Sequence, residues 1–466
     1  AFRDPGELDP QKVCGETGVR ADVRTAAWPL PESPVPFGLE EQYVLQRATC
    51  EIEMNDGIAT SLGKLRKGGA FTVSYFGGSI TEGTSYRPPF TDWLRGAYPQ
   101  AQIREINAGI GGTGSNLGVY RLERDVLAHD PDLVFVEFAL NDSDRSSVDP
   151  TRIGADVEAI VRKIWAHDPT TDIVFLYTIS RKLAETFRLG VQTREAAIYS
   201  TIATRYRIPT VSFAPRVLAL ENAGKLVWTL GMAPTAVPKE DPDYDRKAGA
   251  ELTEKGVLVF SNDAVHPRRE GGELYLQALT NFFSQTMPEE TYAWNHSSLV
   301  NGSTFSLEGY DMCNSHEIVA DDLKGSWRKV AADDPKLGKF LKRTDSMWVS
   351  ETPGDRMEFE FVGKELALYA AWGQNGAKLK VEVDGQRFPD VQLFDRYCTY
   401  FRVMKTPVWK GRRGRHRVVL TILEEQPDRL PVVACRKIPV ARVRSAEFDG
   451  HVTALGRILV DGKVER

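Results

Sequence analysis

Hydrophobic and polar positions follow two different patterns along this 466-residue chain. Up to about residue 287, short apolar runs such as 71–76, 133–138 and 173–177 alternate with longer stretches that carry an apolar residue every three or four positions. The runs predict buried strands, and the longer stretches predict helices with one apolar face. Strands that alternate with such helices form a parallel sheet covered on both sides. The first part therefore predicts a three-layer α/β/α domain.

The second part has shorter, alternating runs. Residues 357–362, 379–383 and 417–423 are separated by Gly, Asn, Asp and Pro, which predicts antiparallel strands in an all-β sandwich or jelly roll. Val-Asp-Gly at 383–385 and again at 460–462 predicts two hairpin turns. The basic stretch from Lys410 to Arg417 predicts a solvated hairpin tip rather than a nucleic-acid patch.

These patterns divide the chain into three segments, and its length suits two or three domains. Residues 1–54 are predicted to be an extended arm, because their first 45 positions are rich in proline and charge and lack periodicity. Residues 55–287 are predicted to form the α/β domain, and residues 288–466 the β-sandwich accessory domain.

Composition narrows the possible partners. A net charge of −5 and a pI near 5.9 give no reason to expect nucleic acid or an anionic membrane as a partner. No apolar run approaches the ~20 residues that a membrane span requires, so we expect a soluble protein. The five cysteines are scattered and odd in number, with no Cys-x-x-Cys, which favours dispersed thiols and a reducing compartment over a disulfide framework or a zinc site. We expect no metal and no cofactor; the oligomeric state stays open.

The chemistry begins where the first predicted strand ends. The run 71–76 leads into Gly77, Gly78 and Ser79. Two glycines allow a sharp turn, and the carboxyl edge of a parallel sheet is where open α/β folds hold their ligands. Ser79 is therefore a candidate nucleophile, although a Gly-Gly-Ser connection without chemical function fits the same letters.

Three later blocks favour the interpretation of Ser79 as a nucleophile. The glycine-rich segment 107–115 and the strand 133–138, followed by Asn141, come next, and Asp263 and His266 lie in Asn-Asp-Ala-Val-His-Pro at 262–267. In this order, the four blocks resemble the SGNH (GDSL-like) hydrolase superfamily over roughly residues 70–287. The resemblance implies a flavodoxin-like strand order, with Ser79 as the nucleophile and Asp263 and His266 as its partners. It also implies an oxyanion hole formed by the backbone N–H groups of Ser79 and Gly112 and the side-chain amide of Asn141.

One position departs from the family pattern. The commonest first block has an aspartate before the serine, and this chain has Gly78. Gly-Gly-Ser-Ile-Thr resembles a recognised branch, so we do not interpret the change as loss of activity.

Elementary chemistry agrees with the implied roles. A serine hydroxyl needs a base to accept its proton as it attacks, and the imidazole of His266 is suited to that task. Asp263 lies three residues earlier, within reach of the far ring nitrogen. A structural histidine, an ordinary turn at Asn141 and a purely conformational glycine at Gly112 are the competing interpretations.

Several further features have two possible explanations. Arg87, Asp142 and Arg145 lie near the blocks and are candidates for substrate contact or for surface ion pairs. The irregular segment 228–252 is a candidate frame for the active site or a solvated excursion. Five tryptophans of the second part are candidate sugar platforms or core residues: Trp294, Trp327, Trp348, Trp372 and Trp409.

Together these features predict a serine esterase that removes a small acyl group, acetyl in particular, from a carbohydrate. Its partner would be a small-molecule, oligosaccharide or polysaccharide ester. The alternatives are a carbohydrate O-acyltransferase, a glycosidase on the same scaffold, and a carbohydrate-binding protein without turnover.

Overall fold

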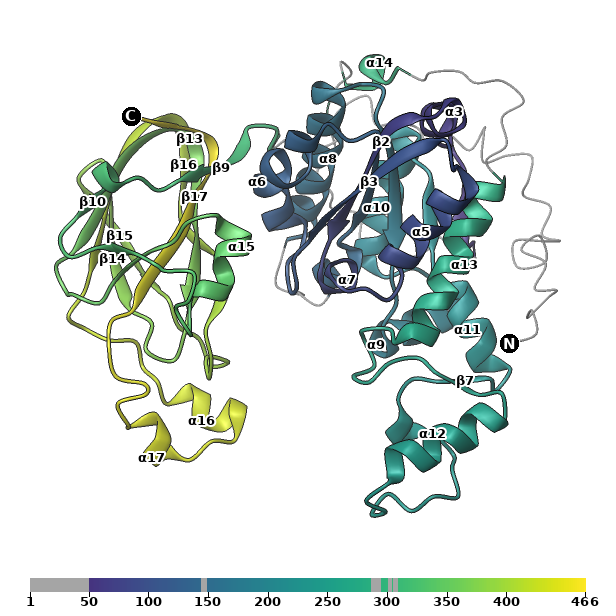
Figure 1. Cartoon of the computed structure of the whole chain (residues 1–466). Helices are drawn as coiled ribbons and strands as arrows, with labels where there is room; N and C mark the ends of the chain where they lie inside the picture. Colours follow the sequence, from purple (N-terminus) through teal and green to yellow (C-terminus); the bar gives the residue numbers. More distant parts are fainter. Residues whose placement is uncertain (1–49, 144–148, 286–294, 301–303, 305–308) are drawn as a thin grey trace. The chain divides into compact units, whose positions relative to one another are not determined.

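The computed structural model describes residues 50–143, 149–285, 295–300, 304 and 309–466 (Figure 1). The chain forms two compact units that meet in sequence between Gly309 and Tyr310. The predicted boundary at 287/288 and residues 1–49 of the predicted arm lie outside the described residues.

The first unit contains a six-stranded sheet with the order β1-β6-β5-β4-β2-β3. Its strands are β1 (Ile52–Glu53), β2 (Gly69–Gly77), β3 (Ala101–Gly109), β4 (Leu133–Glu137), β5 (Asp172–Tyr177) and β6 (Thr210–Ser212). All neighbours pair in parallel except β1, which runs antiparallel to β6. Counted from β2, the parallel strands follow the order 2-1-3-4-5 of flavodoxin-like folds. The predicted α/β fold is confirmed.

Helices cover both faces of this sheet (Figure 1). One face carries α3 (Ala59–Lys67), α5 (Arg87–Ala97), α11 (Ala214–Asn222) and α13 (Arg269–Gln285), whose apolar residues join a single buried cluster with those of β2. On the other side α6 (Ser115–Asp125), α8 (Pro150–His167) and α10 (Arg194–Tyr206) pack side by side. The side chain of Asp149 accepts a hydrogen bond from Thr151 N and so caps the start of α8.

Shorter elements complete the first unit. They are α4 (Ser79–Glu82), η1 (Leu127–His129), α7 (Ala139–Ser143), α9 (Arg181–Arg188), β7 (Leu226–Val227), η2 (Leu230–Met232), α12 (Tyr244–Glu254), β8 (Leu258–Val259) and α14 (Ser297–Val300). The ring of His296, just before α14, stacks on Trp165 of α8, and the backbone N–H of His296 donates to Pro169 O. This packing places residues 295–300 with the α/β unit.

The second unit is an antiparallel nine-stranded sheet. Its strands are β9 (Cys313–Glu317), β10 (Leu323–Lys324), β11 (Arg328–Lys329), β12 (Trp348–Ser350), β13 (Arg356–Trp372), β14 (Lys378–Val383), β15 (Gln386–Gln392), β16 (Arg402–Ile422) and β17 (Thr453–Glu465). The long strand β13 lies between β16 and β17, with register shifts at which the ladders are interrupted. The inward side chains form one apolar core. The prediction of an all-β second domain is confirmed.

Short helices border this sheet. They are η3 (Ala320–Asp322), η4 (Gly338–Phe340), α15 (Leu341–Thr344), α16 (Pro431–Arg436) and α17 (Val440–Val443). The last two pack on the loop after β15 through a separate cluster that contains Phe394 and Phe448.

The two Val-Asp-Gly motifs have different fates. Asp384 and Gly385 have φ values of 54° and 76° and join β14 to β15, as the sequence predicted. The prediction of a second turn is wrong, because Asp461 lies fully buried inside β17 and pairs with Lys364 and Arg413. The predicted hairpin tip at 410–417 is also wrong, because these residues lie within the 21-residue strand β16.

The tryptophans of the second unit lie mostly against its core. Trp327, Trp348, Trp372 and Trp409 are partly buried and pack on the apolar cluster, while Trp294 lies outside the described residues. The core interpretation of these four is the one that the structure matches. In the described part of the chain, no helix is long and apolar enough to cross a membrane.

Candidate active site

The candidate site begins at the carboxyl end of β2, where the chain turns into α4. Ser79 is the first residue of α4. A Cβ at residue 77 would lie 2.4 Å from Thr81 Oγ1, and one at residue 78 would lie 1.9 Å from Asn141 Oδ1. A side chain at residue 77 would also meet the backbone oxygen of Glu137 at 2.6 Å, whereas one at residue 78 would displace the Asn141 side chain, so Gly78 leaves that side chain its space.

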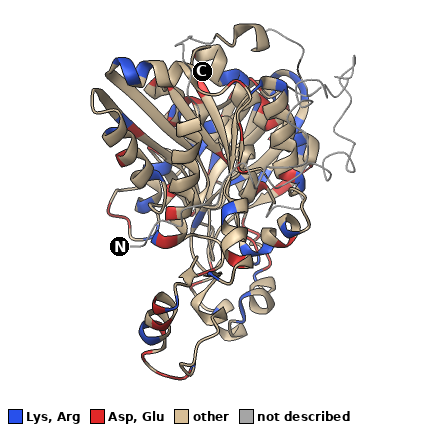
Figure 2. Cartoon of the chain, turned by 90° about the vertical axis from the view of Figure 1, so that its right-hand side faces the viewer, with Lys and Arg blue, Asp and Glu red and all other residues tan. Residues whose placement is uncertain are grey.

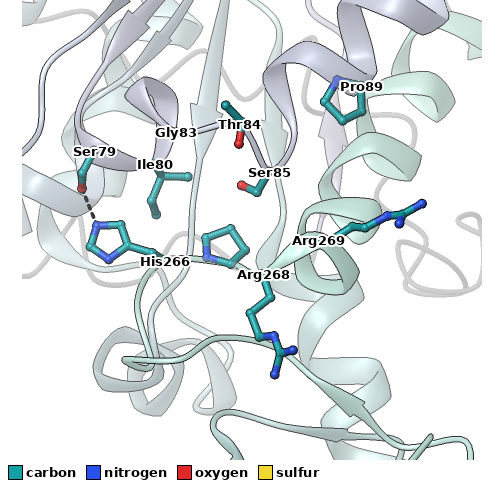
Figure 3. Close-up of a pocket in the computed structure, with 10 residues that line it drawn as sticks. Ser79, Ile80, Gly83, Thr84, Ser85, Pro89, His266, Arg268 and Arg269 are labelled. Carbon is teal, nitrogen blue, oxygen red and sulfur yellow. Dashed lines mark hydrogen bonds between the residues drawn. The ribbon is translucent and has the colours of Figure 1, made fainter. Parts of the chain in front are cut away.

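The hydroxyl of Ser79 meets the ring of His266 although 187 positions separate them. Ser79 Oγ lies 2.7 Å from His266 Nε2, and His266 Nδ1 lies 2.6 Å from Asp263 Oδ2 (Figure 3). When the N–H at Nδ1 donates a hydrogen bond to Asp263, the Nε2 lone pair faces the serine hydroxyl. This is the arrangement in which an imidazole can remove the serine proton.

A compact turn holds Asp263 in place. Its Oδ1 accepts hydrogen bonds from Ser261 Oγ at 2.9 Å and from the backbone N–H groups of Val265 and His266 at 3.0 and 2.9 Å. Partial burial alone would raise the pKa of Asp263, but the hydrogen bonds from His266, Val265 and Ser261 hold it well below its usual range. The carboxylate therefore stays ionised and keeps the ring oriented.

The residues predicted to hold an oxyanion lie around the same turn. The Asn141 amide, on α7, is against Gly78, and a Cβ at residue 111 would be 3.5 Å from Ser79 Cβ. The N–H of Gly111 donates to Glu82 Oε2 at 2.8 Å, and Gly112 follows with φ of +70°, which favours glycine. The structure thus brings both predicted segments to the serine.

Residues 75–274 match the GDSL-like lipase/acylhydrolase family. This part of the chain belongs to that family. The matched range spans all four blocks, and the predicted SGNH-type serine hydrolase is confirmed at the level of the family.

Two solved structures are similar to most of this chain and not to the GDSL-like domain alone. Both are of a two-domain esterase active on acetylated mannans, one of them co-crystallised with mannopentaose. Their TM-scores are 0.60 and 0.61, at 19% and 18% identity, and the matches cover 89% and 88% of this chain and 100% and 99% of theirs. At this identity the likeness establishes the fold of the two domains. No curated protein sequence matches the chain.

The other predicted substrate residues lie elsewhere in the GDSL-like domain. Arg87 is buried, donates to Thr81 O and Gly83 O, and forms an ion pair with Glu105. Arg145 lies outside the described residues. The structure therefore does not bring Arg87 to the opening beside Ser79.

Asp142 also points inward. It accepts hydrogen bonds from Ser115 N at 3.1 Å and Tyr199 Oη at 2.9 Å, and it is 2% exposed. Burial raises its pKa to about 6 despite these bonds. Its geometry suits fixing the start of α6 beside the glycine-rich segment rather than contact with substrate.

A pocket of about 550 Å³ opens beside Ser79 and His266. Its walls come from the segment 79–89 and from residues 266–269 (Figure 3). The volume falls in the range of small-molecule sites. The long segment 228–252 contributes no residue to this lining.

The sequence analysis missed a carboxyl group beneath the nucleophile. Glu137 ends β4 and accepts hydrogen bonds from Thr81 Oγ1 at 2.9 Å and Thr178 Oγ1 at 2.7 Å. Burial raises its pKa to about 7, although the two threonines lower it. The sequence did carry a signal for this residue, because Glu137 is a charged residue at the end of an otherwise apolar strand.

A buried arginine supports the same sheet edge. Arg121 on α6 donates to Ala108 O at 2.6 Å and Gly77 O at 3.0 Å, at the ends of β3 and β2. Its guanidinium lies 4.5 Å from the centre of the Phe76 ring. The described residues contain no group of three or more His, Cys, Asp or Glu side chains placed to hold a metal ion.

Proposed function

We propose that this protein is a serine esterase that removes a small acyl group, acetyl in particular, from a carbohydrate through an acyl-enzyme. The observation that supports this proposal most directly is the hydrogen-bonded series from Ser79 Oγ through His266 to Asp263 at the mouth of a pocket. A serine, a base and an orienting carboxylate in contact are the requirements of nucleophilic acyl transfer.

In the first half of the reaction, Ser79 Oγ attacks the carbonyl carbon of the ester while His266 Nε2 takes its proton. The negative oxygen that forms would be bound by the backbone N–H groups of Ser79 and Gly112 and by the amide of Asn141. His266 then gives the proton to the sugar oxygen as the carbon–oxygen bond breaks. The products are the free sugar hydroxyl and acetyl-Ser79.

In the second half, water attacks the acetyl-enzyme. His266 removes the water proton, the tetrahedral intermediate collapses, and Ser79 recovers its hydrogen as acetate leaves. Asp263 remains ionised throughout and stabilises the protonated ring, in keeping with its low pKa.

The pocket carries polar groups that a sugar substrate can use. Thr84, Ser85, Arg268 and Arg269 stand on its walls beside a few apolar side chains such as Ile80. None of the large exposed hydrophobic residues in the described part of the chain lines it. A long acyl chain requires an apolar groove, whereas a sugar ester with a short acyl group matches hydroxyls and guanidiniums. The structural likeness to an esterase active on acetylated mannans supports the same substrate class.

The alternatives are less well supported. A glycosidase requires two carboxyl groups on either side of the scissile bond, and no Asp or Glu stands among the pocket-lining residues in the described part of the chain. A binding protein without turnover has no need for the serine–histidine contact. An acyltransferase would use the same residues and must be separated by experiment.

Mass spectrometry of acetylated mannan and xylan oligosaccharides provides the test. The wild-type protein should release one or more acetyl groups, Ser79→Ala should release none above background, and Ser284→Ala, at an exposed position on α13, should behave as wild type. Acetyl transfer to an added sugar that outpaces release of acetate would overturn the assignment as a hydrolase. Retention of every acetyl group by the wild type, together with failure to hydrolyse 4-nitrophenyl acetate, would overturn the esterase itself.

A further inference from the structure

We propose that the pocket beside Ser79 binds an anionic group of the substrate, so that the preferred substrate is an acetylated glycan with a carboxylate or sulfate one or two sugar units from the ester. This inference rests on the proposed esterase function and adds the charge of its substrate. Arg268 and Arg269 are the residues that would recognise the anion.

The charge of the pocket walls is the first observation. Arg268 and Arg269 line the pocket, and its described lining contains no carboxylate. The chain as a whole carries 64 acidic and 59 basic residues, so a pocket with two cations and no acid departs from the average surface. The hydroxyls of Thr84 and Ser85 also line the pocket and can donate hydrogen bonds to a carboxylate or sulfate of the substrate.

The ion pairs of these arginines are the second observation. Arg268 Nε lies 3.8 Å from Glu270 Oε2, at the outer limit of an ion pair. Within the described residues, Arg269 has no carboxylate at ion-pair distance. Both guanidiniums can therefore meet an incoming anion without losing a short internal ion pair.

The backbone that carries the arginines is held firmly. Arg268 N donates to Phe260 O at 2.7 Å, and Pro267 forms an isolated bridge with Ser261. On the opposite wall, a Cβ at Gly272 would lie 2.0 Å from Ser85 O, so α13 and the segment 83–85 are in direct contact. The positions from which the two side chains extend are thus set by packing.

The arginines are also close in sequence to the reacting groups. They follow His266 by two and three residues, and in Figure 3 Ser79 and His266 lie at one end of the pocket while Arg269 lies at the other. An ester held at Ser79 would direct its sugar along this pocket towards the guanidiniums. The planar guanidinium fork matches a carboxylate or sulfate with two parallel hydrogen bonds.

A matched pair of substrates tests the charge. The free acid of an acetylated uronate-containing oligosaccharide is compared with its uncharged methyl ester, with acetate release as the measurement. We expect wild-type kcat/KM to be about tenfold to a hundredfold higher for the acid, the range of one or two charge-assisted hydrogen bonds. In the double variant Arg268→Gln/Arg269→Gln this ratio should fall to about one.

Arg246→Gln is the control. Arg246 is an exposed arginine of α12 outside the pocket, so its removal changes net charge equally and should leave the wild-type ratio in place. Added salt should reduce the wild-type ratio, because it screens exposed charges.

A sulfated acetylated oligosaccharide identifies the source of the anion. Preference for the uronate or for the sulfate over the neutral substrate supports the proposal and names the natural anion. Equal kcat/KM for charged and neutral substrates, with wild-type hydrolysis of 4-nitrophenyl acetate intact, overturns this inference alone. Loss of all ester hydrolysis would instead overturn the proposed function.

Discussion

Each unit of this protein contains a histidine whose Nδ1 is hydrogen-bonded to an aspartate, His266 in the first and His416 in the second, and of these two only His266 faces a serine. His266 Nδ1 lies 2.6 Å from Asp263, and His416 Nδ1 lies 2.8 Å from Asp384. The partners of the other ring nitrogen, Nε2, differ. His266 Nε2 lies 2.7 Å from Ser79 Oγ, whereas His416 Nε2 lies 2.9 Å from the carbonyl oxygen of Arg412.

That difference determines what each ring can do. A carbonyl oxygen only accepts hydrogen bonds, so His416 satisfies both partners only when both ring nitrogens carry protons. A serine hydroxyl can donate, so His266 can offer a lone pair. His416 also packs against the rings of Trp409 and Phe361 in the β-sheet unit. The His416–Asp384 pair therefore only links parts of the β-sheet unit, whereas the His266–Asp263 pair faces a group that can act as a nucleophile.

The largest expected difference between the two histidines is in turnover. His266→Gln should lower kcat/KM for 4-nitrophenyl acetate by about 10⁴-fold, because the serine loses its base. His416→Gln should leave turnover within twofold and lower the free energy of unfolding by about 1 kcal/mol, because the hydrogen bond to Asp384 and the ring packing on Trp409 are lost. Esterase kinetics and thermal melts measure both. Equal loss of turnover in the two folded variants would contradict the assignment.

A smaller effect on turnover is expected at Asn141, in the proposed oxyanion hole. Asn141→Ala should lower kcat by about 10²- to 10³-fold with little change in KM, because its amide would act on the negative oxygen of the transition state. Asn222→Ala, at the exposed end of α11, is the matched control and should keep wild-type kinetics. A kcat within threefold of wild type would remove Asn141 from the proposed oxyanion hole.

Gly78 tests how far the serine turn depends on space. A Cβ at this position would lie 1.9 Å from Asn141 Oδ1, so Gly78→Ala should displace that amide and lower kcat by about 10- to 100-fold. Gly96→Ala on α5 meets no atom within 4 Å and should leave activity intact while stabilising the helix by about 0.5–1 kcal/mol. Steady-state kinetics with thermal melts separate the two outcomes. Full activity of Gly78→Ala would show that the Asn141 position is not decisive.

The last prediction concerns stability rather than turnover, at Glu137 beneath Ser79. Burial raises its pKa to about 7, against 4.5 for the ordinary group. Between these values the folded protein holds a proton that the unfolded chain has lost, so the free energy of unfolding should fall as pH rises from 4.5 to 7. Relative to Glu137→Gln, the wild type should lose up to about 3 kcal/mol across this window. Urea unfolding at several pH values measures it, and parallel curves for the two proteins would contradict a buried, titrating Glu137.

Some site residues could be predicted because they are neighbours in the chain. Asp263 and His266 are three positions apart, so a single turn of the chain can bring their side chains together. The direction of Asp142 could not be predicted in this way. It follows Asn141 on α7, where one step rotates a side chain by about 100°, and it points into the domain while Asn141 faces Gly78.

The two Val-Asp-Gly motifs show the same limit in the β-sheet unit. Identical local letters form a turn at 383–385 and a buried strand at 460–462. At the second site, pairing with β13 and β9 and the ion pairs of Asp461 outweigh the local preference of glycine for a turn. Such distant partners leave no trace in a three-residue pattern.

The sequence by itself determined the division into a parallel α/β part and an antiparallel part, because the spacing of apolar residues directly reflects which face of each element is buried. The order of four short blocks was also sufficient to predict the serine, asparagine, aspartate and histidine of the candidate site. Only the tertiary structure decided the partners of His416, the inward direction of Asp142, and that two arginines share a pocket with Ser79. Those outcomes depend on contacts between residues far apart in the chain, and such contacts arise only when the sheet and its helices pack.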